Sequence, residues 1–185
     1  MSNFWTQVNI EPKRKFRWLI SFAGMPQFIA KSVTKPSFGV GTSTHNFLQH
    51  QFNFPGRVTW NDISITIVDP VQPDATVSLY KIIENAGYVL PTDVMSGPEG
   101  MRTISKKGMV ESLGNQILIE QIGIDGSAND SVTEQWVVNN PLITSVAFDS
   151  LDYTTDELLN ITIGIKYDWA SLNETAAQSQ TSWQK

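Results

Sequence analysis

Residues 159–167 read Leu-Asn-Ile-Thr-Ile-Gly-Ile-Lys-Tyr, and apolar side chains occupy every second position of this stretch. A period of two places the apolar side chains on one face of a strand and the other side chains on the opposite face. Residues 63–68, Ile-Ser-Ile-Thr-Ile-Val, show the same period. Both stretches predict half-buried strands and favour a mainly β fold.

Further strands are predicted on both sides of these two. Residues 16–22 alternate in the same way, and 133–139 and 143–148 are short strands separated by Pro141. Residues 116–124 carry Ile and Leu at both parities, which predicts a strand buried on both of its faces.

A long hairpin is predicted from residues 28–35 and 42–54, with the turn in between, where Pro36, Gly39 and Gly41 lie. After this hairpin the apolar parity switches near Asn61-Asp62, as a β-bulge or a change of face requires.

One substantial helix is predicted after Pro70 and Pro73. Asp74 stands at the N-cap position, apolar residues follow at helical spacing, and Gly87 supplies the stop. Residues 88–114 are rich in Gly and Pro and hold no period, which predicts a long loop with at most a short strand near 101–106.

About eight strands and one packed helix favour a mainly β protein, an antiparallel β-sandwich or barrel. We expect one domain over residues 15–169, including the loop at 88–114. Residues 1–14 are expected to be an N-terminal arm, and residues 170–185 a polar C-terminal tail.

The composition restricts the chemistry. The 185 residues include 13 Lys and Arg, 18 Asp and Glu and no Cys, for a net charge of −5. Only 17% of residues are charged, against about 25% in average soluble domains, so part of the surface is expected to be covered. Zero Cys excludes disulfides, thiolate metal sites and cysteine nucleophiles.

Neither a metal centre nor a cofactor site is expected. His45 and His50 are five residues apart, an odd spacing that points them to opposite faces of a strand. Gly39-Val40-Gly41 lacks the third Gly of a dinucleotide fingerprint and is interpreted as a turn. The apolar stretches are far shorter than the ~20 residues that span a bilayer.

A catalytic role is not favoured. No G-x-S-x-G elbow is present. The acids Asp149 and Asp152, or Asp156 and Glu157, could pair as general acid and base for glycoside hydrolysis. Their Ser and Thr neighbours instead predict a solvated turn.

The six Trp residues divide into two groups. Trp18, Trp60, Trp136 and Trp169 lie in or beside predicted strands, where core packing is the common use. Large aromatics near the termini would be exposed on a free arm, which favours docking onto another subunit. These are Trp5 and Trp183.

Two longer segments point to a family. Residues 54–63, Phe-Pro-Gly-Arg-Val-Thr-Trp-Asn-Asp-Ile, precede a strand, the break at Asp69-Pro70 and the helix. Residues 136–143, Trp-Val-Val-Asn-Asn-Pro-Leu-Ile, and 148–153, Phe-Asp-Ser-Leu-Asp-Tyr, precede the last strand. In this order they resemble the tail tube proteins of contractile-tailed bacteriophages of the T-even type, which are related in fold to Hcp-like secretion tubes.

The resemblance implies a structural, non-enzymatic protomer that forms hexameric rings, which stack into the inner tube of a virion tail. Genomic DNA would pass through the lumen when the sheath contracts, without sequence-specific binding. The implied partners are further copies of the chain, the tail sheath, and baseplate and tail-terminator proteins, with assembly in the bacterial cytoplasm and no membrane anchor. Four strands from each of six protomers would give about 24 strands and a backbone diameter of roughly 48 Å.

The contacts between rings are expected in the hairpin region 36–55, the N-terminal arm and the C-terminal tail. Alternative functions are the tube protein of a type VI secretion system, the tube protein of a tail-like bacteriocin, or a baseplate protein that initiates the tube. A monomeric carbohydrate-binding module that uses exposed Trp side chains is a further alternative. The residues expected at contacts between subunits are Trp5, Phe38, Phe47, Phe52, Phe54 and Trp183.

Overall fold

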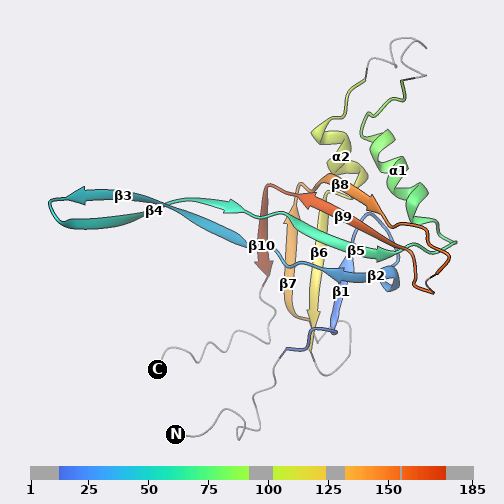
Figure 1. The fold of residues 1–185 in the computed structure, drawn as a ribbon, viewed down its shortest axis with the longest axis horizontal. Helices are drawn as coiled ribbons and strands as arrows, with labels where there is room; N and C mark the ends of the chain where they lie inside the picture. Colours follow the sequence, from blue (N-terminus) through green and yellow to red (C-terminus); the bar gives the residue numbers. More distant parts are fainter. Residues whose placement is uncertain (1–12, 92–101, 124–131, 155, 174–185) are drawn as a thin grey trace, which may run out of the picture.

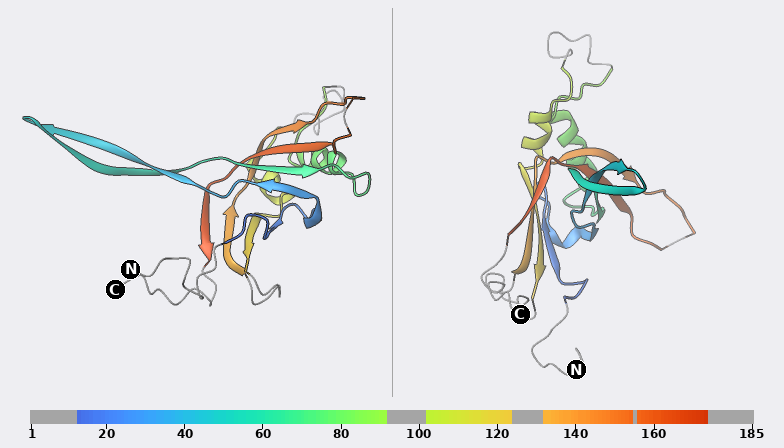
Figure 2. Two further views of the ribbon diagram at one scale, coloured as in Figure 1. Left: turned by 60° about the horizontal axis from the view of Figure 1, so that its bottom comes forward. Right: turned by 90° about the vertical axis from the view of Figure 1, so that its left-hand side faces the viewer.

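The computed structural model describes residues 13–91, 102–123, 132–154 and 156–173. These residues form two four-stranded antiparallel sheets, a separate two-stranded ribbon, two α-helices and one 3₁₀ turn (Figure 1). The strands of one sheet cross those of the other at a large angle, and the ribbon projects away from both sheets (Figure 2). The mainly β, antiparallel fold predicted from the sequence is confirmed.

Sheet A has the strand order β1 (Trp18–Ser21), β6 (Gln116–Ile122), β7 (Val132–Asn139) and β10 (Trp169–Asn173). Its inner face contributes Ile20, Ile117 and Ile119 to the core. The prediction that residues 116–124 are buried on both faces is wrong. Only one face of β6 is fully buried, because on the other face Leu118, Glu120 and Ile122 are half-buried.

Sheet B has the order β2 (Ala30–Val33), β5 (Ile63–Val68), β9 (Asn160–Lys166) and β8 (Leu142–Phe148). The register places Ile163 opposite Ile65, and both side chains are fully buried. The alternation predicted for β5 and β9 is confirmed, and these two strands form the centre of sheet B.

Helix α1 (Ala75–Asn85) begins as predicted. The Asp74 carboxylate accepts a hydrogen bond of 2.9 Å from the Val77 N–H, and α1 buries Leu79 and Ile82. The chain leaves this helix through Gly87, whose φ is +113°. A Cβ at Gly87 would lie 2.5 Å from the Thr103 carbonyl oxygen, so only glycine fits this close approach.

The prediction of a single helix is wrong. A second helix, α2 (Lys106–Ser112), lies in the segment predicted to be a loop, and residues 102–105 form no strand. The Ser105 hydroxyl caps α2 by accepting from the Gly108 N–H at 3.0 Å, and Met109 and Leu113 are buried. Gly108 suits the packing of the helices, because a Cβ there would lie 3.0 Å from the Ala86 Cα.

The ribbon consists of β3 (Phe38–Phe47) and β4 (His50–Trp60). The predicted hairpin of 28–35 with 42–54 is therefore wrong, and so is the turn at Gly39-Val40-Gly41. Residues 39–41 lie inside β3, and the chain reverses at Leu48-Gln49, with Leu48 at φ +53°. Residues 27–35 instead contain the 3₁₀ turn (Gln27–Ile29) and β2. The parity switch at Asn61-Asp62 marks the passage from the ribbon into sheet B.

Strand β10 extends the folded body beyond the predicted boundary at residue 169. Residues 170–173 pair with β7 and belong to sheet A rather than to a tail. Within the described residues, neither helix has the length and apolar character needed to cross a bilayer.

Candidate assembly surfaces

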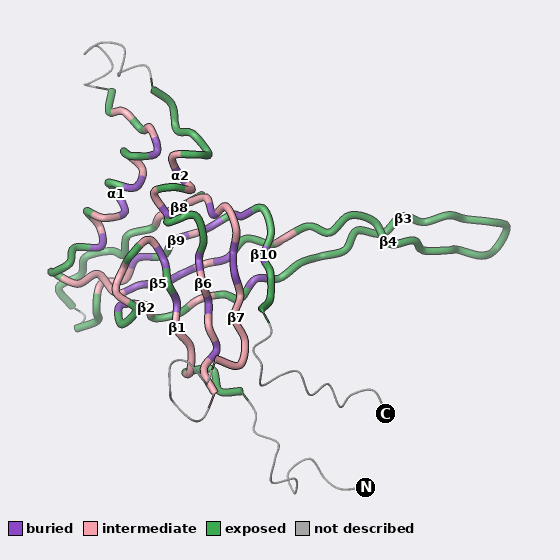
Figure 3. The backbone as a smooth tube through the Cα atoms, turned by 180° about the vertical axis from the view of Figure 1, so that it is seen from behind, coloured by how far each residue is buried: buried purple, intermediate pink, exposed green. Residues whose placement is uncertain are grey.

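The arm formed by β3 and β4 has almost no buried surface. Every residue of the two strands is exposed except Trp60, which is half-buried (Figure 3). The two strands form a sheet of their own. An isolated two-stranded hairpin is at best marginally stable in water, and exposed aromatic side chains mark interaction sites. The arm therefore has the character of a surface that is covered in an assembly.

The far half of the arm has an aromatic face. Cross-strand partners share a face, and the register places Phe54 opposite Ser43, Phe52 opposite His45, and Phe47 opposite His50. Phe47, Phe52 and Phe54 are 60%, 50% and 56% exposed. The opposite face is polar and carries Thr42, Thr44, Asn46, Gln51 and Asn53. Three of the residues predicted from the sequence thus lie together on one side of the arm, which we call the aromatic face.

Phe38 lies apart from this aromatic face, at the root of the arm. Its ring packs edge-on against Trp60 at 5.3 Å between centroids, and Trp60 packs against Tyr167 of the body at 5.9 Å. A register shift between Val40 and Thr42 separates the root from the far half. Phe38 therefore joins the arm to the body. The other two predicted residues, Trp5 and Trp183, lie outside the described residues.

Glu134 ties the arm root and the N-terminal segment to sheet A. Its carboxylate forms ion pairs with Lys13 and with Lys35, the latter at 2.8 Å, and accepts from the Trp136 Nε1–H. Burial raises the pKa of Glu134, but these three hydrogen bonds outweigh burial and lower it to about 2. Lys35 leads from β2 into β3, so Glu134 fixes the start of the arm. Glu134 carries no local sequence signal, because its partners lie about 100 residues away along the chain.

The outer face of sheet A, which points away from the core, is nearly uncharged and mixes polar residues with apolar ones such as Leu118 and Val137. Gln135 donates to Glu120 at 2.7 Å, and Asn173 donates to Gln135 at 3.0 Å. Gln116 donates to Asn139 at 3.0 Å. By the strand register, Glu120 is the one charged residue that β1, β6, β7 and β10 place on this face.

Among the described residues, no further strand pairs with either edge of sheet A, so we call these edges open. Strands β1 and β10 occupy opposite ends of the order, and every neighbouring pair in the sheet is antiparallel. In a four-stranded sheet of this kind the two edge strands run in opposite directions. On β10, Trp169 and Leu172 are 49% and 46% exposed. Unpaired edges of this kind are templates for pairing with another chain.

The acids considered for catalysis lie in the exposed connection between β8 and β9. Asp152 accepts two hydrogen bonds of 2.9 Å from the N–H and hydroxyl of Thr154, and these bonds lower the pKa of Asp152. A general acid requires a raised pKa, so Asp152 is poorly suited to that role. The structure thus supports the prediction of a solvated turn.

The two histidines do not form a metal site with other described residues. His45 and His50 lie on the same face of the arm, because the turn at Leu48-Gln49 places them on different strands. The prediction that they point to opposite faces is therefore wrong. No group of three or more His, Cys, Asp or Glu that could hold a metal is found among the residues that the structure describes.

The described Trp residues serve mainly in packing, as predicted. Trp18, Trp60 and Trp136 are partly buried against the core. Trp169, at the open edge of sheet A, is the exposed one among the described Trp residues.

Comparison with solved structures identifies the fold. A chain of the cryo-EM structure of the anti-feeding prophage cap, described as the AFP tube-terminating cap, superposes with a TM-score of 0.65 at 16% identity. A chain of the sheath-tube complex of an extracellular contractile injection system, PVC, superposes with a TM-score of 0.62 at 16% identity. Each comparison covers 95% of this chain and 100% of the other. The fold is that of contractile-particle tube proteins.

A chain of the PVC sheath/tube terminator shares this tube fold, with a TM-score of 0.58 at 18% identity over 90% of the present chain and 99% of the other. No family model and no curated protein matches the sequence. The relation to tube proteins predicted from residues 54–63 and 136–153 is therefore confirmed at the level of the tube fold.

Proposed function

We propose that this chain is a structural, non-enzymatic subunit of a tail-like tube, in which copies join through sheet A. Strand β10 of one copy pairs with β1 of the next. The observation that carries the proposal is the four-stranded antiparallel sheet with two open edges that run in opposite directions. Head-to-tail pairing of such edges continues one antiparallel sheet from copy to copy and can close into a ring.

A ring of six copies is the closure that we propose. Six copies with four strands each give about 24 strands, which at ~4.8 Å spacing and roughly 40° tilt form a barrel about 48 Å in backbone diameter. Side chains reduce the lumen to about 40 Å, which admits duplex DNA. In this barrel the inner faces of sheet A and sheet B remain the protomer core, and the outer face of sheet A lines the lumen.

The lumen of the proposed ring is suited to the passage of a polyanion. The outer face of sheet A carries Glu120 and no Lys or Arg from its four strands. A wall without cations does not neutralise phosphates, so DNA slides past without being held. We propose genomic DNA as the cargo and a contractile virion tail, assembled in the bacterial cytoplasm, as the location. The sheath, the baseplate and the tail terminator are the proposed partners.

The arm supplies the proposed contact between stacked rings. Its aromatic face, with Phe47, Phe52 and Phe54, is exposed in the protomer and would be covered by the adjacent ring. The terminal aromatics Trp5 and Trp183 are proposed to take part in the same contacts. In this arrangement burial of three Phe side chains stabilises the stack, at about 1.5–3 kcal/mol for each fully buried side chain.

The tube of an injection particle with protein cargo is a second candidate function. The comparisons favour it, because the matched chains come from the anti-feeding prophage and from an extracellular contractile injection system. The carbohydrate-binding module has less support. Of the described Trp residues only Trp169 is exposed, so these residues do not form a platform of several Trp side chains.

Negative-stain electron microscopy with light scattering tests the proposal. The purified chain, examined at rising concentration, is expected to form six-fold rings and then tubes with a lumen of about 40 Å. Rings of another symmetry with the same lumen wall would correct the copy number. A stable 20.6 kDa monomer at all concentrations, retained on a polysaccharide column, would contradict the tube function.

A further inference from the structure

A cleft of about 560 Å³ opens beside the edge strands of the two sheets. Its apolar lining is formed by Trp18, Val33 and Ile119. Cationic side chains from the segment before β1, from β2 and from the start of the arm surround this lining. They are Lys13, Arg14, Lys15, Lys31 and Lys35.

Positive charge is in excess at this basic cleft. Among the described residues, the carboxylate at the cleft is that of Glu134, which is shared by Lys13 and Lys35. Glu120 also lines the cleft, but the register places its side chain on the outer face of sheet A. Glu120 is already hydrogen-bonded to Gln135. Lys31 donates to the neutral Asn160 side chain at 3.1 Å. Arg14 and Lys15 form no ion pair with a described residue, so cations are left for a partner.

The connection between β8 and β9 has the opposite character. Its carboxylates are Asp149, Asp152, Asp156 and Glu157, and no Lys or Arg occurs between residues 149 and 159. None of the four forms an ion pair within the described residues. Leu151 and Tyr153 lie between these acids, and their side chains are 88% exposed and fully exposed, respectively. We call residues 149–154 and 156–158 the acidic loop.

We propose that the acidic loop of one copy docks in the basic cleft of a neighbouring copy. The inference rests on the proposed tube function and deepens it by naming a contact between subunits. The two surfaces match in two respects: acids face cations, and the exposed Leu151 and Tyr153 meet the apolar lining at Trp18 and Val33. A nucleic acid would pair with the cations but would leave Tyr153 uncovered.

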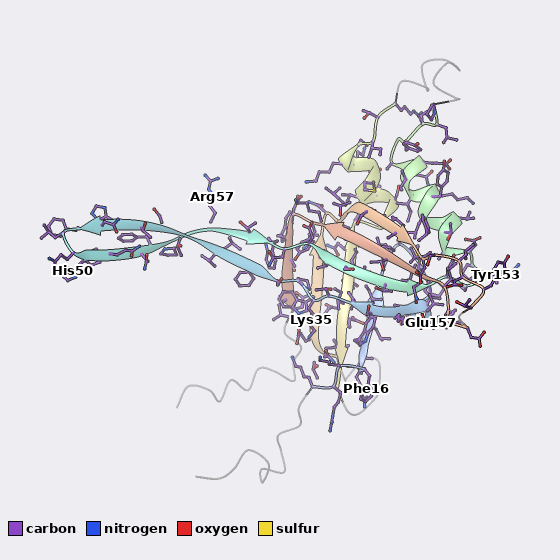
Figure 4. The ribbon with its side chains drawn as sticks, in the orientation of Figure 1. Phe16, Lys35, His50, Arg57, Tyr153 and Glu157 are labelled. Atoms are coloured by element: carbon purple, nitrogen blue, oxygen red, sulfur yellow. The ribbon has the colours of Figure 1, made fainter. Side chains whose placement is uncertain are left out.

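The outer part of the loop points away from its own cleft, although its first acid, Asp149, lines a pocket together with Lys31. Tyr153 and Glu157 project from the end of the body farthest from the arm, whereas Lys35 and Phe16 lie near the arm root and at the base of sheet A (Figure 4). A contact between two different surfaces of identical copies is heterologous, and it repeats from copy to copy into a ring or a stack. This is the symmetry that a tube requires.

The contact is electrostatic and therefore sensitive to salt. Single exposed ion pairs contribute little, but a cluster of opposed charges steers association, and like charges brought together cost several kcal/mol. Screening over about 8 Å at physiological ionic strength weakens such a contact progressively as salt rises.

Two charge-reversal variants test the proposal. The cleft variant carries Lys15→Glu and Lys31→Glu, and the loop variant carries Asp156→Lys and Glu157→Lys. Each variant alone is expected to raise the critical concentration for assembly by about tenfold or more, because its loop and its cleft then carry charges of the same sign and repel each other. An equimolar mixture is expected to assemble at the wild-type concentration, since each variant then finds its complement in the other.

Matched controls change the same number of charges elsewhere. Lys81→Glu with Lys107→Glu, on the exposed sides of α1 and α2, is expected to leave assembly unchanged. Thermal unfolding of each variant, followed by circular dichroism under conditions where it is monomeric, verifies that the protomer is folded. All substituted side chains are exposed, so melting temperatures near the wild-type value are expected.

The outcomes separate this contact from the tube function itself. If the wild-type chain forms tubes and each variant alone also forms them at the wild-type concentration, the docking proposal is overturned and the tube function stands. If the mixture fails to assemble although both variants are folded, the proposal is likewise overturned. Binding of a short DNA duplex that is lost in the cleft variant, with assembly unchanged, would assign the cleft to nucleic acid instead. A wild-type chain that never assembles overturns both proposals.

Discussion

The body and the arm of this chain are both built from antiparallel strands, but they use their apolar residues in opposite ways. In sheet B, Ile65 and Ile163 are fully buried against the core. In the arm, Phe47 and Phe52 are at least half exposed. A strand that buries nothing inside its own protomer gains its stability elsewhere. The body is thus stabilised by its own core, whereas the exposed arm is the surface that we propose for assembly.

The largest effect is expected from replacing the aromatic face. The variant Phe47→Ser, Phe52→Ser, Phe54→Ser removes three side chains at the proposed ring contact, and its critical concentration for tube formation should rise by at least about 100-fold. The free energy of unfolding of the protomer should change little, because these side chains are exposed. Sedimentation velocity measures assembly, and urea unfolding measures stability.

A control for this variant comes from the opposite face of the same strands. Thr44→Ala, Asn46→Ala and Asn53→Ala change three exposed polar residues of the arm. We expect this control to form tubes at the same critical concentration as the wild type. Equal loss of assembly in both variants would show that the aromatic face has no special role.

The next largest effect is expected on the free energy of unfolding, which a substitution in the body should lower more than a substitution in the arm. Ile163→Ala, in the centre of sheet B, should lower the free energy of unfolding by about 3 kcal/mol, through lost burial and the cavity left behind. Phe52→Ala should lower it by less than about 0.5 kcal/mol, as exposed substitutions do. Denaturant unfolding of the monomer compares them. Similar losses for the two variants would contradict the view that the arm contributes nothing to the protomer core.

Glu134 connects the body with the root of the arm, and its ionisation makes the stability of the protomer depend on pH. Its pKa is lowered from 4.5 to about 2 in the folded protein, so its contribution to stability is present above pH 4.5 and is lost as the pH falls towards 2. Glu134→Gln should lower the free energy of unfolding by about 1–2 kcal/mol at pH 7, a value that allows for solvent screening of the exposed lysines. The difference from wild type should shrink between pH 4.5 and 2. A difference that stays constant over this range would refute the role of the ion pairs.

The smallest effect concerns a helix of the body. Asp74→Ala removes the N-cap of α1 and should destabilise the protomer by about 1 kcal/mol. Asp156→Ala, in the exposed acidic loop, is the matched control and should have almost no effect on the monomer. Thermal unfolding of the monomeric proteins compares the two. A melting temperature for the Asp74 variant as high as that of the control would exclude a stabilising cap.

The body could be predicted from the sequence because burial on one face enforces alternation. Residues 63–68 and 159–167 pack against the core with one face only, so their alternating pattern identifies both the strand and its buried face. Helix α2 was missed because Gly108 and Gly114 resemble loop residues. Gly108 is small because it packs against Ala86, a contact between helices that no local pattern records.

The arm was harder to predict for the same physical reason. Without a core on either side, its strands need no alternation, and the turn at Leu48-Gln49 contains neither Gly nor Pro. The turn predicted from Gly39 and Gly41 is therefore wrong, because both residues lie inside β3. Phe47, Phe52 and Phe54 were predicted at an assembly contact, but their shared face depends on the position of the turn at Leu48-Gln49, which the sequence alone does not show.

Hydrogen exchange of the backbone amides, compared between the monomer and the assembled tube, tests the central claim most directly. In the monomer we expect rapid exchange in β3 and β4 and slow exchange in β5 and β9, since stability against opening follows buried contacts. In the tube, exchange in β3, β4 and the edge strands β1 and β10 should slow by at least about tenfold, while β5 and β9 stay unchanged. An arm that is equally protected in the monomer and in the tube, or that still exchanges rapidly in the tube, would contradict the account.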